Sequence, residues 1–165
     1  MDKLVSNFGK KIKQIVDIQM LISVIALVLL ILINAYEIFV RNTFDKSIIW
    51  IQDISILLMV WMVFLGFSKI VYNKNTIRIT VVYDKFPSII KSFLDCFRFI
   101  VIIIFFIILS FASYKLIVSQ YGQGTTTASI PLVYYTSAVL VNAITIILIY
   151  INEFMKTTIL RQGGR

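Results

Sequence analysis

Four long apolar segments alternate with shorter polar segments along the 165-residue chain. A helix of about 22 to 24 residues is roughly 33 to 36 Å long, which is enough to cross a hydrocarbon core of about 30 Å. An isolated strand would leave its backbone groups unsatisfied in lipid, so the Ile-rich third segment should also be helical. The pattern therefore predicts an all-α integral membrane protein with four transmembrane helices, at about 18–40, 48–71, 97–118 and 130–151.

The second segment is the one around which the chain is organised. Fourteen of its residues, from Ile48 to Val71, are Ile, Leu, Val or Phe, and together they favour insertion by roughly 4 to 8 kcal/mol. One carboxylate near the segment's end does not outweigh this. A single helical face combines aromatic and polar side chains and should meet protein, either the first helix or a large partner subunit. That face consists of Trp50, Asp53, Leu57, Trp61, Phe64 and Ser68.

Residues 1–17 combine an apolar helical stripe with four lysines. This pattern suits a basic amphipathic helix on an anionic leaflet, and it equally suits a solvated leader that obeys the positive-inside rule. A cleaved signal peptide is disfavoured because the apolar run that follows is long and lacks a small-x-small site. Within that run, small and polar residues form one face that predicts a closely packed neighbouring helix. That face consists of Ser23, Ala26, Leu30, Asn34, Glu37 and Arg41.

Polar segments connect the predicted helices. The first, 42–47, offers Asp45 or Ser47 as a cap for the helix that follows. The second, 72–92, contains a period-two alternation at 76–81, which predicts a short extended piece at the membrane surface.

The third connection, 119–130, contains no charged residue and is expected to be a flexible loop. Ser129 and Pro131 are residue types that favour the start of a helix, so the fourth span should begin beside them.

The basic residues indicate the orientation of the helices. Outside the apolar cores, alternate segments carry twelve Lys and Arg residues on one side and two on the other. Because basic residues accumulate on the cytoplasmic side, both termini are expected to be cytoplasmic. The net charge of +8 follows from this distribution and gives no reason to expect a nucleic-acid partner. We expect one membrane domain over 1–165, surrounded by lipid.

Three ionisable residues lie close to membrane depth on the first two helices: Glu37, Arg41 and Asp53. Residues of this kind are functional candidates, so Glu37 or Asp53 could be the proton-accepting carboxylate of a small exporter. All three lie near helix ends, however, whereas a coupling site belongs at the midplane. This placement favours a structural role in which Arg41 neutralises one or both acids.

Other chemistry finds little support in the sequence. The chain has no histidine and one cysteine, so it lacks the usual haem ligand and cannot form an internal disulfide. No phosphate-binding loop, metal-ligand cluster or nucleophile–base pair is present in the sequence, and we expect neither an enzyme nor a bound cofactor or metal. The residues singled out are assigned structural or subunit-interface roles: Glu37, Arg41, Trp50, Asp53, Trp61, Phe64 and Gly66.

Part of the chain resembles the small membrane subunit of TRAP transporters, the DctQ-like family. The resemblance extends over about 18–152, and its specific part is confined to 41–79. Asp53 stands where the family usually has Glu, and Thr76 stands where it usually has His. The residues that carry the resemblance are Arg41-Asn42, Ile49-Trp50 followed by Asp53, Trp61-x-x-Phe64-Leu65-Gly66, a basic loop ending near Ile77, and Pro131 at the last span.

The resemblance implies one subunit of an ion-driven importer in three parts. A periplasmic substrate-binding protein would capture an organic anion such as a carboxylate or an acidic sugar. A large multi-span membrane subunit would carry the substrate and ion sites, and this chain would pack against it and support it. The residues by themselves also allow a self-contained four-helix proton-coupled exporter of small molecules that uses Glu37 or Asp53.

The charge asymmetry generates a topological prediction. A periplasm-active reporter fused after Gly122 should be active, and the same reporter fused after Lys74 or Gly163 should be silent, because the first site lies in the uncharged loop and the others lie in basic segments. The opposite activity pattern would reject the model in which both ends are cytoplasmic.

Overall fold

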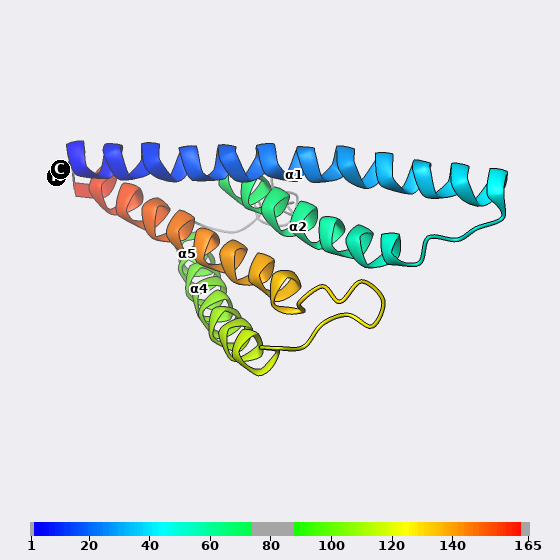
Figure 1. Ribbon diagram of the computed structural model, residues 1–165. Helices are drawn as coiled ribbons and strands as arrows, with labels where there is room; N and C mark the ends of the chain where they lie inside the picture. The colour runs from blue at the N-terminus through cyan, green and yellow to red at the C-terminus, as the bar shows by residue number, and fades with distance from the viewer. Residues whose placement is uncertain (1, 74–87, 163–165) are drawn as a thin grey trace.

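A computed structural model describes residues 2–73 and 88–162. It contains four long helices: α1 (Asp2–Phe44), α2 (Trp50–Tyr72), α4 (Ser88–Ser119) and α5 (Val133–Gln162) (Figure 1). Each contains a segment long and apolar enough to cross a membrane. The prediction of an all-α protein with four candidate spans is therefore confirmed. The extended piece predicted at 76–81 lies outside the described residues.

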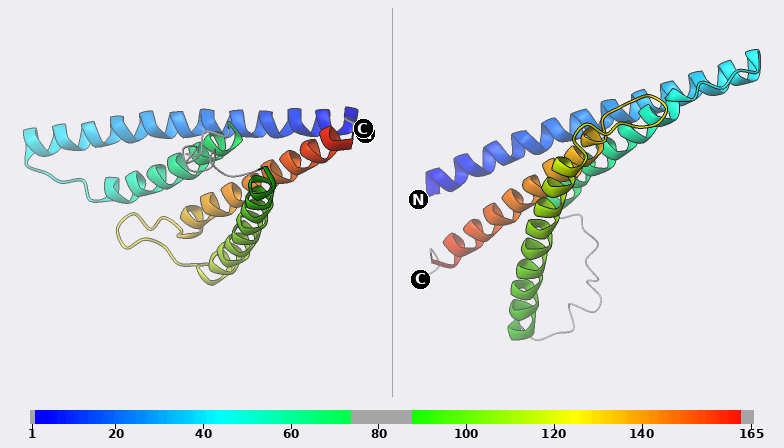
Figure 2. Two further views of the ribbon diagram at one scale, coloured as in Figure 1. Left: turned by 180° about the vertical axis from the view of Figure 1, so that it is seen from behind. Right: turned by 60° about the horizontal axis from the view of Figure 1, so that its bottom comes forward.

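The helices form a group of three with a fourth at its side. α1, α2 and α5 pack on one another, whereas α4 packs chiefly against α5. The two views in Figure 2 show α4 diverging from the direction of α1 and α2. The start of α1 and the end of α5 lie together at one end of the molecule (Figure 1). Helix α5 is consequently the element that contacts all three others.

α1 joins the predicted leader and the predicted first span into a single helix. Its 43 residues make it roughly 64 Å long, about twice the thickness of a hydrocarbon core. Its buried side chains recur every three or four residues along one seam, the spacing that two packed helices require. The buried members of this seam are Ile12, Val16, Gln19, Ser23 and Ala26.

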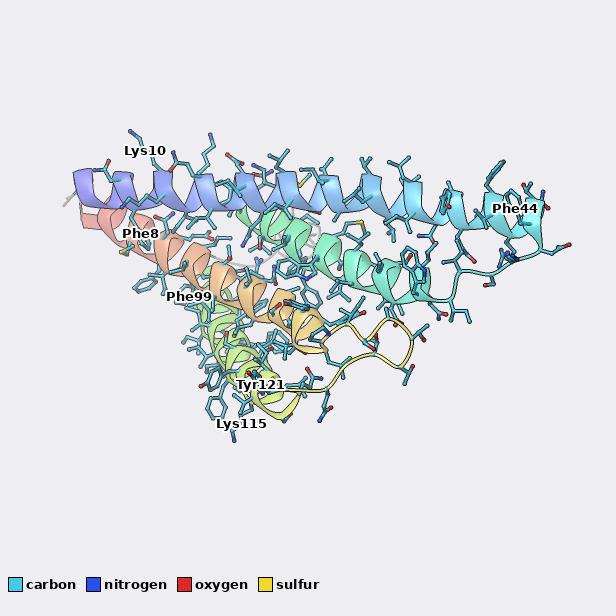
Figure 3. The ribbon with its side chains drawn as sticks, viewed as in Figure 1. Phe8, Lys10, Phe44, Phe99, Lys115 and Tyr121 are labelled. Carbon is cyan, nitrogen blue, oxygen red and sulfur yellow. The ribbon has the colours of Figure 1, made fainter. Side chains whose placement is uncertain are left out.

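The apolar stripe of the leader is covered by protein. Ile12 and Val16 belong to one core cluster with Val71 of α2 and with Ile146 and Ile149 of α5. In Figure 3 the side chain of Phe8 points from α1 towards α5, and Phe8 packs against the same cluster. Phe8, Ile12 and Val16 therefore serve helix packing inside the chain, whereas Ile15 is exposed.

Polar side chains join α5 to α1 and α2 at the next level of the bundle. The amide of Gln19 donates a hydrogen bond to Thr145 Oγ1 over 2.8 Å. Asn142 donates to Ser68 Oγ over 2.9 Å and also donates to the carbonyl oxygen of Phe64. These groups are nearly inaccessible to solvent, so each bond fixes the relative position of two helices whose apolar surfaces alone would allow sliding.

The closest approach of two helices occurs between α1 and α2. The Ser23 hydroxyl donates to the carbonyl oxygen of Met62 over 2.7 Å, and a Cβ atom placed on Gly66 would lie 2.9 Å from Ser23 Oγ. About three turns further along α1, Asn34 donates to Ser55 Oγ over 3.0 Å. The small and polar face predicted for the first helix thus packs against α2 from Ser23 to Asn34.

Two predicted helix starts were wrong in detail. α2 is preceded by Ile49, which makes no side-chain capping bond, so neither Asp45 nor Ser47 caps it. α1 continues to Phe44 and ends where Asp45 takes a positive φ of 49°. α5 begins at Val133 because Pro131 first forms an isolated antiparallel bridge with Gly124.

The contact between Ser23 and Gly66 yields a stability prediction. Gly66→Ala should lower the melting temperature in mild detergent, because overpacking typically costs about 1–3 kcal/mol and the new methyl also displaces the Ser23 hydroxyl from Met62. The gain in helix propensity, about 1 kcal/mol, is smaller.

The control is the same change made in a Ser23→Ala background. There the next atom of residue 23 lies 3.8 Å away, an ordinary contact, so Gly66→Ala should be tolerated. Equal melting temperatures for Gly66→Ala and the unmodified protein would show that the two helices are not this close.

Candidate functional site

The central polar feature is a carboxylate that anchors a loop. Asp53, in the first turn of α2, accepts a hydrogen bond from the backbone N–H of Ala128 over 2.9 Å. The Thr125 side chain and the Thr127 backbone also hydrogen-bond to this carboxylate. Donors from the segment between α4 and α5 therefore converge on one side chain of α2.

The anchored segment is an ordered turn. Thr125 N–H donates to the Ile130 carbonyl over 2.9 Å, and Leu132 N–H donates to the Gln123 carbonyl over 3.0 Å. At its tip, Ser129 adopts a positive φ of 54° and its backbone lies close to Gly124, where an added Cβ would come within 3.2 Å. The segment expected to be a flexible loop, 119–130, therefore contains several hydrogen bonds and is anchored by a carboxylate, neither of which its composition reveals.

The aromatic and polar face of α2 continues from Asp53 along α5. Tyr135 donates its hydroxyl to the backbone carbonyl of Asp53 over 2.8 Å, and the Trp61 indole donates to the Tyr134 carbonyl over 3.0 Å. Further along, the carbonyl of Phe64 accepts from Asn142. The face was predicted to meet the first helix or a large partner subunit. Within the chain, Asp53, Trp61 and Ser68 of this face meet the 125–128 turn and α5, while a different side of α2 meets α1.

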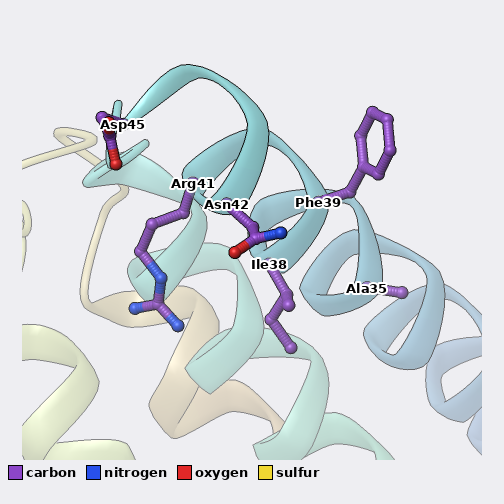
Figure 4. A pocket seen from close by; sticks show the side chains of 6 residues that line it. All are labelled: Ala35, Ile38, Phe39, Arg41, Asn42 and Asp45. Carbon is purple, nitrogen blue, oxygen red and sulfur yellow. The ribbon is translucent and has the colours of Figure 1, made fainter.

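The remaining predicted residues lie apart from this interface. Arg41 and Glu37 form an ion pair within α1, with 3.9 Å between Nη1 and Oε1, and the arginine side chain is 60% exposed. Arg41 lines a shallow hollow at the end of α1 together with Ile38, Phe39 and Asn42 (Figure 4). Arg41 thus pairs with Glu37, and Asp53 is held by the loop instead. Trp50 is about half exposed.

A second ion pair escaped the sequence interpretation. Lys69, in the last turn of α2, forms a salt bridge and hydrogen bond with Asp17 of α1. No local motif links these residues, because only the antiparallel packing of α1 and α2 brings them together. Asp17 lies twenty residues before Glu37 on one helix, so the two charged levels are separated by roughly 30 Å, about the thickness of a hydrocarbon core.

The arrangement is that of a helical membrane subunit whose ionisable groups hold the chain together. Glu37 and Arg41 neutralise each other, and Asp53 closes a loop onto α2. Within residues 2–73 and 88–162, no group of three or more His, Cys, Asp or Glu side chains could hold a metal ion. The fold and these contacts define a multi-helix membrane protein.

Comparison with protein families identifies the system to which this membrane protein belongs. The family model described as "Tripartite ATP-independent periplasmic transporters, DctQ component" matches residues 30–159, and the chain belongs to this family. It is the small membrane subunit of a TRAP transporter and is not an enzyme. The search of curated proteins returned no significant match. Membership decides between the two functions left open by the sequence, in favour of the transporter subunit over the exporter.

The loop anchor can be tested with a double-mutant cycle. Asp53→Ala and Thr125→Val should each lower the melting temperature, and the double variant should lose less than the sum, because both changes break the same hydrogen bond. Arg41→Gln is the matched control: combined with Asp53→Ala, its effect should be additive, since Arg41 pairs with Glu37. Additivity for Thr125 together with coupling for Arg41 would contradict the structure.

Proposed function

We propose that this subunit packs against the large multi-span membrane subunit and supports it as a fixed scaffold during ion-coupled uptake of organic anions, such as carboxylates or acidic sugars. A periplasmic substrate-binding protein would deliver the anion. The whole chain would act as one membrane domain in the bacterial inner membrane, with both termini in the cytoplasm.

One observation supports the scaffold role above the others. Asp53, the carboxylate that most resembles a coupling group, already receives backbone and hydroxyl hydrogen bonds from the 125–128 turn. A group that must bind and release an ion in each transport cycle needs an accessible alternative state. Here such a state would require the turn to detach from α2.

The exposed faces are consistent with a subunit that is surrounded by other apolar surfaces. On α2 one stripe of large apolar side chains is directed away from α1 and α5: Ile56, Met59, Val63, Phe67 and Ile70. α4 exposes most of its Ile and Phe side chains, and only Ser113 of its described residues is buried. We assign these faces to contact with lipid and with the large subunit.

The separation of the charged levels supports the proposed orientation. The Asp17–Lys69 pair lies at the same end as the lysines of α1, and the Glu37–Arg41 pair and the anchored loop lie towards the other end. A membrane placed between these levels leaves the lysine-rich end of α1 in the cytoplasm, as the positive-inside rule requires.

The scaffold role predicts how Asp53 variants behave in the complete transporter. When co-expressed with its large subunit, the chain should co-purify in mild detergent. Asp53→Asn keeps one acceptor oxygen for the turn, so complexes that assemble should retain their transport rate per complex in proteoliposomes, whereas Asp53→Ala should reduce the yield of complex.

A coupling carboxylate would give a different pattern. Asp53→Asn would then assemble normally and abolish transport. That result, or transport by this chain purified without any partner, would overturn the scaffold proposal.

A further inference from the structure

The lysine-rich end of α1 carries charge that the helix packing does not use. Lys10, Lys11 and Lys13 are exposed, and the seam residues that alternate with them, Ile12 and Val16, are buried. In Figure 3 the side chain of Lys10 points away from the other helices, on the side opposite to Phe8. Three ammonium groups therefore project from one short stretch of helix on its free surface.

The buried seam determines how the lysine-rich end of α1 is oriented relative to the membrane. A basic amphipathic helix that lies flat on a leaflet inserts its apolar face between the lipids. Here that face is occupied by Val71, Ile146 and Ile149, and α1 continues without a break into its membrane span. The lysines are thus carried by a helix that passes through the headgroup layer in line with the span.

The height of the lysines above the apolar region follows from the Asp17–Lys69 pair. Lys13 is one turn from Asp17, at roughly 6 Å along the axis, and Lys10 is roughly 10 Å away. Headgroup layers extend for about 5–8 Å beyond the hydrocarbon on each side, so Lys13 lies within this layer and Lys10 lies at its outer edge. Asp17 is bound to Lys69 and also interacts electrostatically with Lys13. Its single negative charge offsets only one of these four lysines, so an excess of positive charge remains.

We infer that Lys10, Lys11 and Lys13 form a binding surface for the phosphates of anionic phospholipids in the leaflet next to the α1 N-terminal end. The class of ligand is set by charge and depth: three exposed cations, with a local excess of positive charge, stand at the level of lipid phosphates. Lipid binding at this surface does not depend on substrate transport, so the inference applies to the isolated subunit as well as to the complex.

The test measures lipid-dependent stability of the full-length chain. In nanodiscs, the protein is titrated with phosphatidylglycerol in a phosphatidylcholine background, and its melting temperature is recorded. Each basic residue near an anionic surface changes affinity by about fivefold, so a Lys10→Gln/Lys11→Gln/Lys13→Gln variant should need at least about tenfold more phosphatidylglycerol for the same stabilisation. Raising the salt concentration should weaken the response of the unmodified protein and leave that of the variant nearly unchanged.

Matched controls separate this surface from general effects of charge. Lys46→Gln/Lys115→Gln removes basic residues outside the lysine-rich end of α1 and should leave the titration unchanged. Inorganic phosphate added in place of the lipid should not stabilise the protein, because the three lysines interact with a charged membrane surface and do not bind a single free anion.

An unchanged phosphatidylglycerol titration in the triple variant would overturn the inference. If that unchanged titration were accompanied by loss of co-purification with the large subunit, the lysines would be assigned to an acidic protein surface. A triple variant that loses its lipid response and also fails to co-purify would still support the lipid site. The loss of co-purification would then be a separate effect on assembly.

Discussion

The contact between Asp53 and the 125–128 turn connects the two halves of the chain. Asp53 belongs to the α1–α2 pair, and the turn belongs to the α4–α5 pair, so this carboxylate and its donors tie the first helix pair to the second. Two further hydrogen bonds between α2 and α5, made by Tyr135 and Trp61, lie on the same side of α2 and extend this contact along the helix. A polar group in a membrane protein must find its partner within protein or water, and here that requirement brings the 125–128 turn and the start of α5 onto α2.

The same requirement explains the distribution of the buried polar residues. In lipid, apolar helices gain little by choosing one apolar neighbour over another, so small residues and hydrogen bonds determine the pairing. Ser23 and Gly66 bring α1 and α2 together, and Asn142 and Thr145 bring α5 onto both. α4 offers few groups of this kind, and accordingly it has a single principal neighbour.

The number and type of the helices were predictable, because each depends on a long apolar run that must satisfy its own backbone. Their limits were not, since α1, α4 and α5 each extend well beyond the predicted span at one end. The seam of α1 was also predictable from Ser23, Ala26 and Asn34, since small and polar residues recur on one helical face. The partner of Asp53 was not, because the donors at Thr125 and Ala128 lie in a segment whose composition indicates only a loop. The Asp17–Lys69 pair likewise depends on the register of α1 and α2. No local pattern specifies this register, because the two residues are 52 positions apart in the sequence.

The central position of α5 has a consequence for biogenesis. Helices enter the membrane in the order of synthesis, and α5 is the last of the four. Until it arrives, α4 lacks its principal neighbour and Trp61, Ser68 and the backbone carbonyl of Asp53 lack the partners that α5 supplies. The native bundle is therefore completed only when the final helix is in place. A chain whose synthesis ends before α5 still exposes polar groups on its membrane surface, where the cell's quality-control machinery can recognise them.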